Sequence, residues 1–231
     1  MKCVILQPSY IPWRGYFDLI HRADVFVFYD DVQYDKHGWR NRNRIKTAQG
    51  TQWLSIPVHN KGATAGLMIR DVRTNDDQQW AHKHLATLRH SYANAPHLTD
   101  YRPWIERVYA APPPLLADFT IATTIDIAGM LGITSTKFLR SSELGVGGGK
   151  TERLVNIVRH VGATEYLSGP SARDYIEPQK FEEAGIALEY IDYTYPEYPQ
   201  LHPPYDAQVS ILDLLFMTGS EAPNYIWGSK V

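Results

Sequence analysis

The N-terminal residues 2–29 alternate between apolar runs and polar segments in the order strand, loop, helix, strand. An apolar run over Lys2–Gln7 predicts a buried strand, and apolar residues at helical spacing in Tyr16–Arg22 predict a helix. Asp24–Tyr29 is rich in β-forming residues and predicts a second strand. Two strands joined through a helix in so short a span indicate a βαβ unit. We therefore predict an α/β fold with a mainly parallel sheet flanked by helices.

The rest of the chain continues this alternation. Further strands are predicted over Trp53–Val58, Leu67–Val72, Lys137–Arg140, Tyr166–Ser168 and Leu188–Ile191. Further helices are predicted over residues 76–92, 103–110, 115–131, 150–161, 179–184 and 210–217. The proline run 112–114 cannot continue a helix and is the expected hinge. We expect one domain over residues 1–231, in which the helix-rich segment 76–131 is an insertion or a lid.

The composition narrows the class of protein. Hydrophobic residues make up 44% of the chain and charged residues 21%, as in a globular protein. The net charge of −2 argues against non-specific binding of nucleic acids. The single cysteine, Cys3, cannot form an internal disulfide, and no apolar stretch reaches the ~18 residues of a membrane span, so we expect a cytoplasmic location. The excess of 15 Tyr and 6 Trp over 7 Phe suits ligands such as sugars and nucleobases.

The loop between the first strand and the first helix is the strongest candidate for a binding site. Two prolines and a glycine fix it, and the backbone N–H groups of a helix start attract anions. It resembles the first strand-loop-helix of HIGH-type nucleotidyltransferases but lacks their histidine pair. A rigid strand-to-helix connection is the alternative. The candidate substrate-binding residues in this loop are Gln7, Ser9, Tyr10, Trp13 and Tyr16.

An acidic pair follows the second strand. Adjacent side chains of an extended chain point in different directions, so Asp30 and Asp31 need not share a task, and either is a candidate general base. His59 follows the strand predicted over Trp53–Val58 and is a third catalytic candidate. Gln33 is a candidate for substrate binding. No carboxylate or histidine spacing indicates a metal, and no cofactor is indicated.

A basic segment comes next. If it is extended, the arginines at 40, 42 and 44 and Lys46 share one face, which favours an anion opposite them. The amides at 41 and 43 lie on the other face. A solvated edge strand or an internal ion-pair network with the upstream aspartates is the alternative. The candidate substrate contacts here are Trp39, Arg40, Asn41, Arg42, Asn43 and Lys46.

Two later loops supply the remaining candidates. The glycine stretch before Lys150 and Thr151 opens a helix but fails the G-x-x-x-x-G-K-[ST] pattern of a phosphate loop. An anion site there competes with a mobile loop in which Thr151 is a helix cap. Ser168 and Ser171 follow a predicted strand and are candidate ligand contacts. Neither sits in a nucleophile elbow, so a structural turn is the alternative.

The three N-terminal motifs together resemble the signature of the WbqC-like protein family. That signature has a Q-P-x-Y-x-P-W-x-G-Y run, a D-D-V-Q-Y run and a W-R-N-R-N-x-I-K run, found here at residues 7–16, 30–34 and 39–46. Tyr166–Tyr175 and Val209–Phe216 resemble its later blocks, so the likeness spans the whole chain. The resemblance implies that the protein functions together with bacterial enzymes of surface-polysaccharide and amino-sugar biosynthesis. It implies no particular catalytic residue.

Three functions fit these patterns. The first is a transferase of lipopolysaccharide O-antigen or amino-sugar biosynthesis that attaches an acyl or aminoacyl group to a nucleotide-linked amino sugar. In this hypothesis cations at positions 40, 42 and 46 hold the phosphates, and one of the two aspartates takes a proton. The second is a nucleotidyltransferase or ATP-dependent ligase, and the third is a non-catalytic partner of polysaccharide enzymes. The expected ligand is a phosphate-bearing nucleotide sugar, and a homo-oligomer is compatible with the sequence.

Overall fold

A parallel sheet of five strands forms the centre of the protein, which is described by a computed structural model for residues 1–59 and 66–228. Its strands stand in the order β5-β2-β1-β6-β7. All four neighbouring pairs are parallel. The strands are β1 (Lys2–Leu6), β2 (Val25–Phe28), β5 (Lys137–Arg140), β6 (Glu165–Ser168) and β7 (Ala187–Tyr190). The predicted α/β class with a mainly parallel sheet is therefore confirmed.

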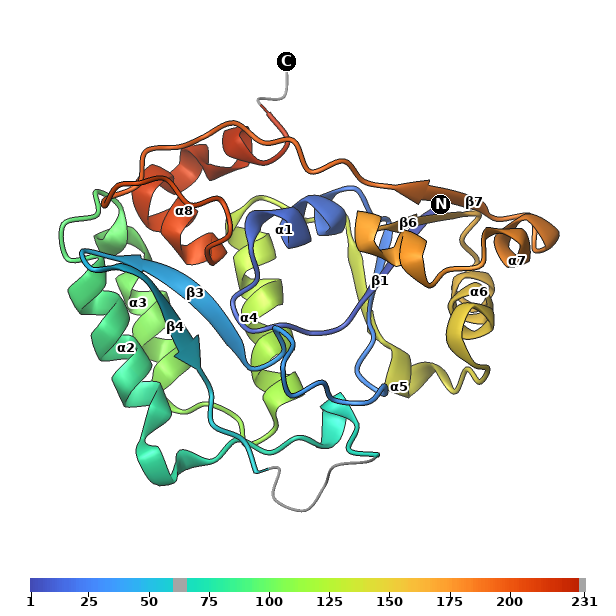
Figure 1. Cartoon of the computed structure of the whole chain (residues 1–231), viewed down its shortest axis with the longest axis horizontal. Helices are drawn as coiled ribbons and strands as arrows, with labels where there is room; N and C mark the ends of the chain where they lie inside the picture. The colour runs from blue at the N-terminus through green and yellow to red at the C-terminus, as the bar shows by residue number, and fades with distance from the viewer. Residues whose placement is uncertain (60–65, 229–231) are drawn as a thin grey trace.

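Alternate side chains of the central strands feed two separate cores. Val4 and Phe26 enter one core, whereas Ile5 and Val27 enter the other, as the period of two in a strand requires. The first core is covered by α1 (Arg14–His21), α4 (Leu116–Met130) and α8 (Ile211–Thr218). The second is covered by α6 (Lys150–His160) and α7 (Pro178–Glu183). Figure 1 shows these two groups of helices on opposite sides of the sheet.

The helix-rich segment 76–131 packs on the first core. It contains η2 (Asp76–Gln78), α2 (Trp80–Ser91), α3 (Leu98–Ala110) and α4. Trp80 and Ile105 from this segment are buried in the same core as Val4. The shorter elements elsewhere are η1 (Ile69–Asp71), α5 (Ser141–Leu144), η3 (Pro170–Asp174) and η4 (Gly219–Tyr225). Of the helices in the described residues, none combines the length and apolar character that crossing a membrane requires.

Two of the predicted strands differ from the structure. The run at 53–58 lies at the end of β4 (Gly50–Ser55), which pairs with β3 (Arg42–Thr47) as an antiparallel hairpin outside the main sheet. The strand predicted over Leu67–Val72 is wrong, because η1 occupies its second half up to Asp71 and only an isolated bridge joins Gln33 to Met68. A short apolar run forms a strand only where a neighbouring strand is available to pair with it.

Candidate functional site

A cavity of about 1010 Å³ lies at the carboxyl ends of β1 and β6. The chain leaves β1 through α1 toward one edge of the sheet and leaves β6 through α7 toward the other edge. Because α1 and α7 cover opposite faces, neither helix closes the gap between the two strand ends. Open α/β sheets bind their ligands at such a reversal of strand order.

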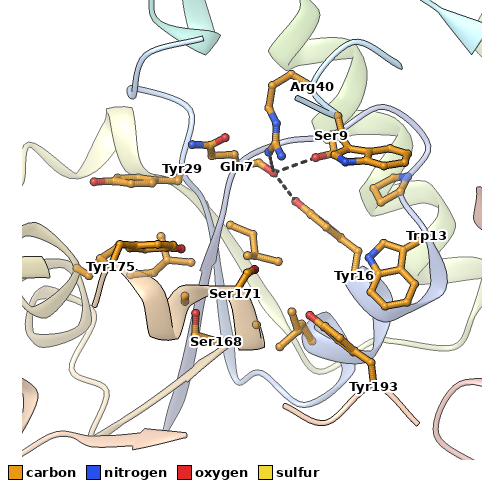
Figure 2. A pocket seen from close by; sticks show the side chains of 18 of the residues that line it. Gln7, Ser9, Trp13, Tyr16, Tyr29, Arg40, Ser168, Ser171, Tyr175 and Tyr193 are labelled. Carbon is orange, nitrogen blue, oxygen red and sulfur yellow. Dashed lines mark hydrogen bonds between the residues drawn. The ribbon is translucent and has the colours of Figure 1, made fainter. Parts of the chain in front are cut away.

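The loop after β1 forms one wall of the cavity. Its Gln7, Ser9 and Tyr16 all line the space (Figure 2). The main-chain oxygen of Gln7 accepts hydrogen bonds from the Tyr16 hydroxyl at 3.2 Å, the Ser9 hydroxyl at 3.4 Å and the Arg40 guanidinium at 3.0 Å. These three bonds hold the loop in place before any ligand arrives.

Trp13 extends this wall toward the β6 side. A Cβ atom on Gly15 would lie 2.4 Å from the indole of Trp13, so only glycine lets the ring lie across the start of α1. The ring meets Tyr193 edge to face, with 4.7 Å between the ring centroids. The Tyr193 hydroxyl in turn approaches Gly169, which follows β6. An aromatic pair therefore spans the gap between the two strand ends.

The coil that carries Tyr193 is fastened to α1 by a buried arginine. The Arg14 guanidinium donates to the main-chain oxygens of Pro196 at 2.8 Å and Tyr225 at 3.0 Å, and to the Tyr205 hydroxyl at 2.8 Å. The guanidinium carbon also lies 4.8 Å from the centroid of the Tyr195 ring, which adds a cation–π interaction. Arg14 is thus a structural residue that holds the distal coil against the site.

The end of β6 and the start of η3 form the opposite wall. Ser168 is buried at the end of the strand, and Ser171 lies in η3. Asp174 and Tyr175 complete this wall, and the Tyr175 side chain is 67% exposed at the rim. Figure 2 shows the hydroxyl groups of Ser168 and Ser171 and the ring of Tyr175 on this wall, and Asp174 adds a carboxylate to it.

Arg40 places a partly buried cation beside the cavity. Its guanidinium donates to the main-chain oxygens of Gln7 at 3.0 Å and Pro8 at 3.4 Å, while its buried Nε has no partner. Among the described residues no carboxylate forms an ion pair with it. Burial lowers the pKa of Arg40, and Tyr16 and Asp35 oppose that shift. Since an arginine stays charged in proteins, such a group favours a bound anion.

Lys150 brings a second cation to the rim at the start of α6. Its backbone φ of 48° lies in the left-handed region, which is strained for a residue with a side chain. The preceding glycine loop is held by Arg153 and Asn156, which donate to the main-chain oxygens of Val146 and Gly147. Thr151 lies outside the cavity, where its buried hydroxyl accepts from the Glu177 N–H at 3.1 Å.

The acidic pair does not reach the cavity. Asp30 is fully buried and accepts from the Ser142 N–H at 3.0 Å and the Ser142 hydroxyl at 2.9 Å. Asp31 forms an ion pair with Arg153, and the Ser141 hydroxyl lies 2.5 Å from its Oδ1. These bonds join the end of β2 to α5 and α6. The structure therefore places both aspartates where a fold-stabilising role explains every contact.

Three other candidates also lie away from the cavity. Tyr10 is buried in the first core, where its hydroxyl meets Tyr109 and the Nδ1 of His84, 2.9 Å away. Gln33 is exposed and bridges to the backbone at Met68. His59 is exposed, and its backbone N–H donates to Arg73 at 3.0 Å. The strand before His59 belongs to the hairpin β3–β4 and not to the main sheet, so His59 does not follow a strand end that borders the cavity.

The basic segment is divided between the cavity and the fold. Trp39, Arg40 and Asn43 line the cavity, and the Asn43 amide donates to the main-chain oxygens of Tyr10 and Ile11. The other three candidates make structural bonds to backbone oxygens: Asn41 to Ile56, Arg42 to Gly38 and His37, and Lys46 to Pro204.

Several cavity residues escaped the sequence analysis. They are Tyr29, Tyr166, Asp174, Tyr175, Tyr193 and Gln208. The excess of tyrosine gave no positions, and the family block Tyr166–Tyr175 contains three of these residues without assigning them a role. Tyr29 directly precedes the acidic pair, and its ring lies 5.2 Å from the Arg153 guanidinium. The carboxyl ends of parallel strands meet at one edge of a sheet. A position at the end of a predicted strand was therefore a better indicator of a cavity residue than a charged side chain.

Comparisons with known proteins agree with the sequence motifs. The model of the WbqC-like protein family matches residues 7–225. An uncharacterized protein of Mycobacterium tuberculosis, Rv1507c, is 43% identical over 227 residues, which cover 97% of each chain. No solved structure matches the chain.

Proposed function

The chain belongs to the WbqC-like protein family, and from this premise we propose that it is a transferase whose cavity binds a phosphate-bearing nucleotide sugar. The observation that carries the proposal is Arg40, a partly buried cation beside the cavity that forms no ion pair with a carboxylate among the described residues. A phosphate oxygen supplies the missing charge and accepts from the planar guanidinium.

The remaining lining fits the other parts of such a ligand. The cavity volume of about 1010 Å³ is at the upper end of the roughly 300–1,000 Å³ that is typical of small-molecule sites. Trp13, Tyr175 and Tyr193 offer aromatic faces to a base or a sugar ring. Ser168 and Ser171 offer hydroxyl groups to polar substituents. The site thus combines one anion-binding group with a mixed aromatic and hydroxyl surface.

The transfer itself is proposed to be acylation or aminoacylation of an amine on the sugar. The amine nitrogen attacks the carbonyl carbon of the donor, the N–C bond forms, and the donor's leaving group departs with its electron pair. The amine must also lose a proton. We assign its acceptance to Asp174, the sole carboxylate among the described residues that line the cavity, in place of Asp30 and Asp31.

Calorimetric titration tests the binding step. UDP, UDP-N-acetylglucosamine and dTDP-glucose are titrated into the protein, and we expect saturable binding of at least one of them. Lys150→Ala should weaken that binding, because it removes a rim cation whose ammonium group forms no hydrogen bond or ion pair with the described residues. Lys83→Ala on the exposed face of α2 is the matched control and should bind as the unchanged protein does. Absence of binding by all three nucleotides would refute the proposal.

A nucleotidyltransferase is the second candidate, and one observation favours it. The starts of α1 and α6 both border the cavity, so two helix N-termini are available to a triphosphate. In that reaction the substrate oxygen attacks the α-phosphorus of ATP, and pyrophosphate leaves. The protein is incubated with ATP, Mg²⁺ and a sugar phosphate. Release of pyrophosphate from the ATP would support this candidate over acyl transfer.

A further inference from the structure

Two exposed tryptophans lie side by side next to the cavity. Trp39 is 40% exposed and Trp53 is 44% exposed, and both exceed the other four tryptophans, all of which are within the described residues. Their ring centroids are 5.0 Å apart, and their planes are tilted by 41°. Two large aromatic rings grouped in solvent indicate a binding surface, because an isolated fold would gain free energy by burying them.

Arginines hold the two rings in position. The register of the hairpin places Trp53 opposite Arg44, whose guanidinium lies 5.8 Å from the centre of each indole. Arg42 lies 4.7 Å from the centre of the Trp53 ring. Both guanidinium groups are themselves fixed, Arg42 by the carbonyl of Gly38 and Arg44 by Gln208. The rings are therefore ordered before a ligand binds, which lowers the entropic cost of binding.

This pair adjoins the cavity. Trp39 lines the cavity, as does Gln208, the residue that holds Arg44. The opposite face of the hairpin is closed by Ile45 and Leu54, which are buried in the first core. A ligand that fills the cavity and extends past Trp39 therefore meets Trp53 next.

The geometry points to a pyranose ring as the group bound by this pair, and we propose that Trp39 and Trp53 form a carbohydrate subsite. The C–H face of a pyranose packs on an indole, and its hydroxyl groups meet the guanidinium N–H groups beside the rings. The 5.0 Å between the ring centroids leaves no room for a ring to enter between the two indoles, so the pyranose packs on their solvent-facing side. The subsite rests on the proposed function in one respect, since it assigns the sugar ring of the nucleotide sugar to the tryptophan pair, with the reacting amine directed into the cavity that Asp174 lines, and the nucleotide part to the cavity.

A titration followed by NMR tests the subsite without a nucleotide. Methyl N-acetyl-β-D-glucosaminide and methyl β-D-glucoside are added to the ¹⁵N-labelled protein, and the indole N–H signals of its six tryptophans are followed. We expect saturable shifts in the signals of Trp39 and Trp53, assigned with Trp39→Phe and Trp53→Phe, while the other four remain in place. Shifts in neither signal, or in all six, would overturn the subsite. Shifts caused by oligo(dT) and by neither glycoside would also overturn it.

A second arm separates this inference from the proposed function. Trp53→Ala should lower the affinity for UDP-N-acetylglucosamine roughly tenfold, toward that of UDP, and leave the affinity for UDP within about twofold. Trp53→Phe keeps an aromatic face and should restore most of the loss. An unchanged ratio of the two affinities in Trp53→Ala would contradict the subsite while leaving the cavity proposal intact. Failure of both nucleotides to bind, with the glycoside shifts present, would refute the cavity proposal alone.

Discussion

Replacing Arg40 by methionine should separate ligand binding from folding. Methionine keeps a long unbranched stem but removes the guanidinium, its charge and its hydrogen bonds. The main-chain oxygen of Gln7 would lose one donor, yet it keeps the hydroxyl groups of Tyr16 and Ser9. The substitution therefore leaves that backbone group with partners and removes a partly buried cation that forms no ion pair with a carboxylate among the described residues.

The expected magnitudes differ for the free and the bound protein. Without ligand, the loss of two bonds to carbonyl oxygens is offset by relief from holding a partly buried charge without an ion-pair partner among the described residues. The free energy of unfolding of Arg40→Met should therefore fall by less than about 1 kcal/mol, or rise. With ligand, the loss of a charge-assisted hydrogen bond costs roughly 1.5–3 kcal/mol. That loss corresponds to a roughly 10- to 150-fold higher Kd.

Urea denaturation of the free protein and calorimetric titration with the nucleotide sugar measure these two quantities. A nearly neutral effect on unfolding combined with a large loss of affinity would support Arg40 as the anion-binding group. The opposite result, a loss of more than about 2 kcal/mol in the free energy of unfolding with an unchanged Kd, would refute the reasoning. It would mean that Arg40 acts through the backbone of the loop and does not act on the ligand.

Three further predictions concern the residues that shape the fold around the site. Gly15→Ala should displace the Trp13 ring and lower the free energy of unfolding by about 1–3 kcal/mol, measured by urea denaturation with near-ultraviolet dichroism of the indole. Burial lowers the pKa of His84 to about 4, so unfolded chains take up a proton first as the pH falls below about 6.5. Up to roughly 3 kcal/mol of stability should then be lost between about pH 6.5 and pH 4, and His84→Asn should flatten that profile. Tyr198→Phe removes a 2.7 Å hydrogen bond to the buried Asp213 and should lower the free energy of unfolding by about 1–3 kcal/mol. An unchanged free energy of unfolding would show that the carboxyl group of Asp213 finds another donor.

The main sheet was largely predictable because each strand carries a compact apolar run beside a helix of clear periodicity. The predicted bounds of Lys137–Arg140 agree with β5, and Lys2–Gln7 exceeds β1 by one residue. The hairpin was harder, since Arg42–Thr47 is mostly polar and Pro57 favoured a later strand end than Ser55. Whether such a segment forms a strand depends on the segment with which it pairs, and a single sequence does not reveal that partner.

The candidate site was predictable where its residues follow a strand. Gln7 after β1 and Ser168 at the end of β6 were named from sequence, and both line the cavity. Charge was a poorer guide, because Asp31 is neutralised by Arg153, which lies far away in the sequence. Tyr193 was out of reach for another reason. It lies in a coil without periodicity, and only the folded chain brings it to Trp13.

The reversal of strand order has a consequence for how the protein is made. During translation the loop after β1 leaves the ribosome early, whereas β6, η3 and the coil carrying Tyr193 emerge only after the helices of residues 76–131. A nascent chain that ends before Ser168 has the first βαβ unit and Arg40 but lacks the opposite wall. The complete cavity therefore forms only when the two halves of the sheet have joined, and a ligand that needs both walls cannot serve as a template for the earliest steps of folding.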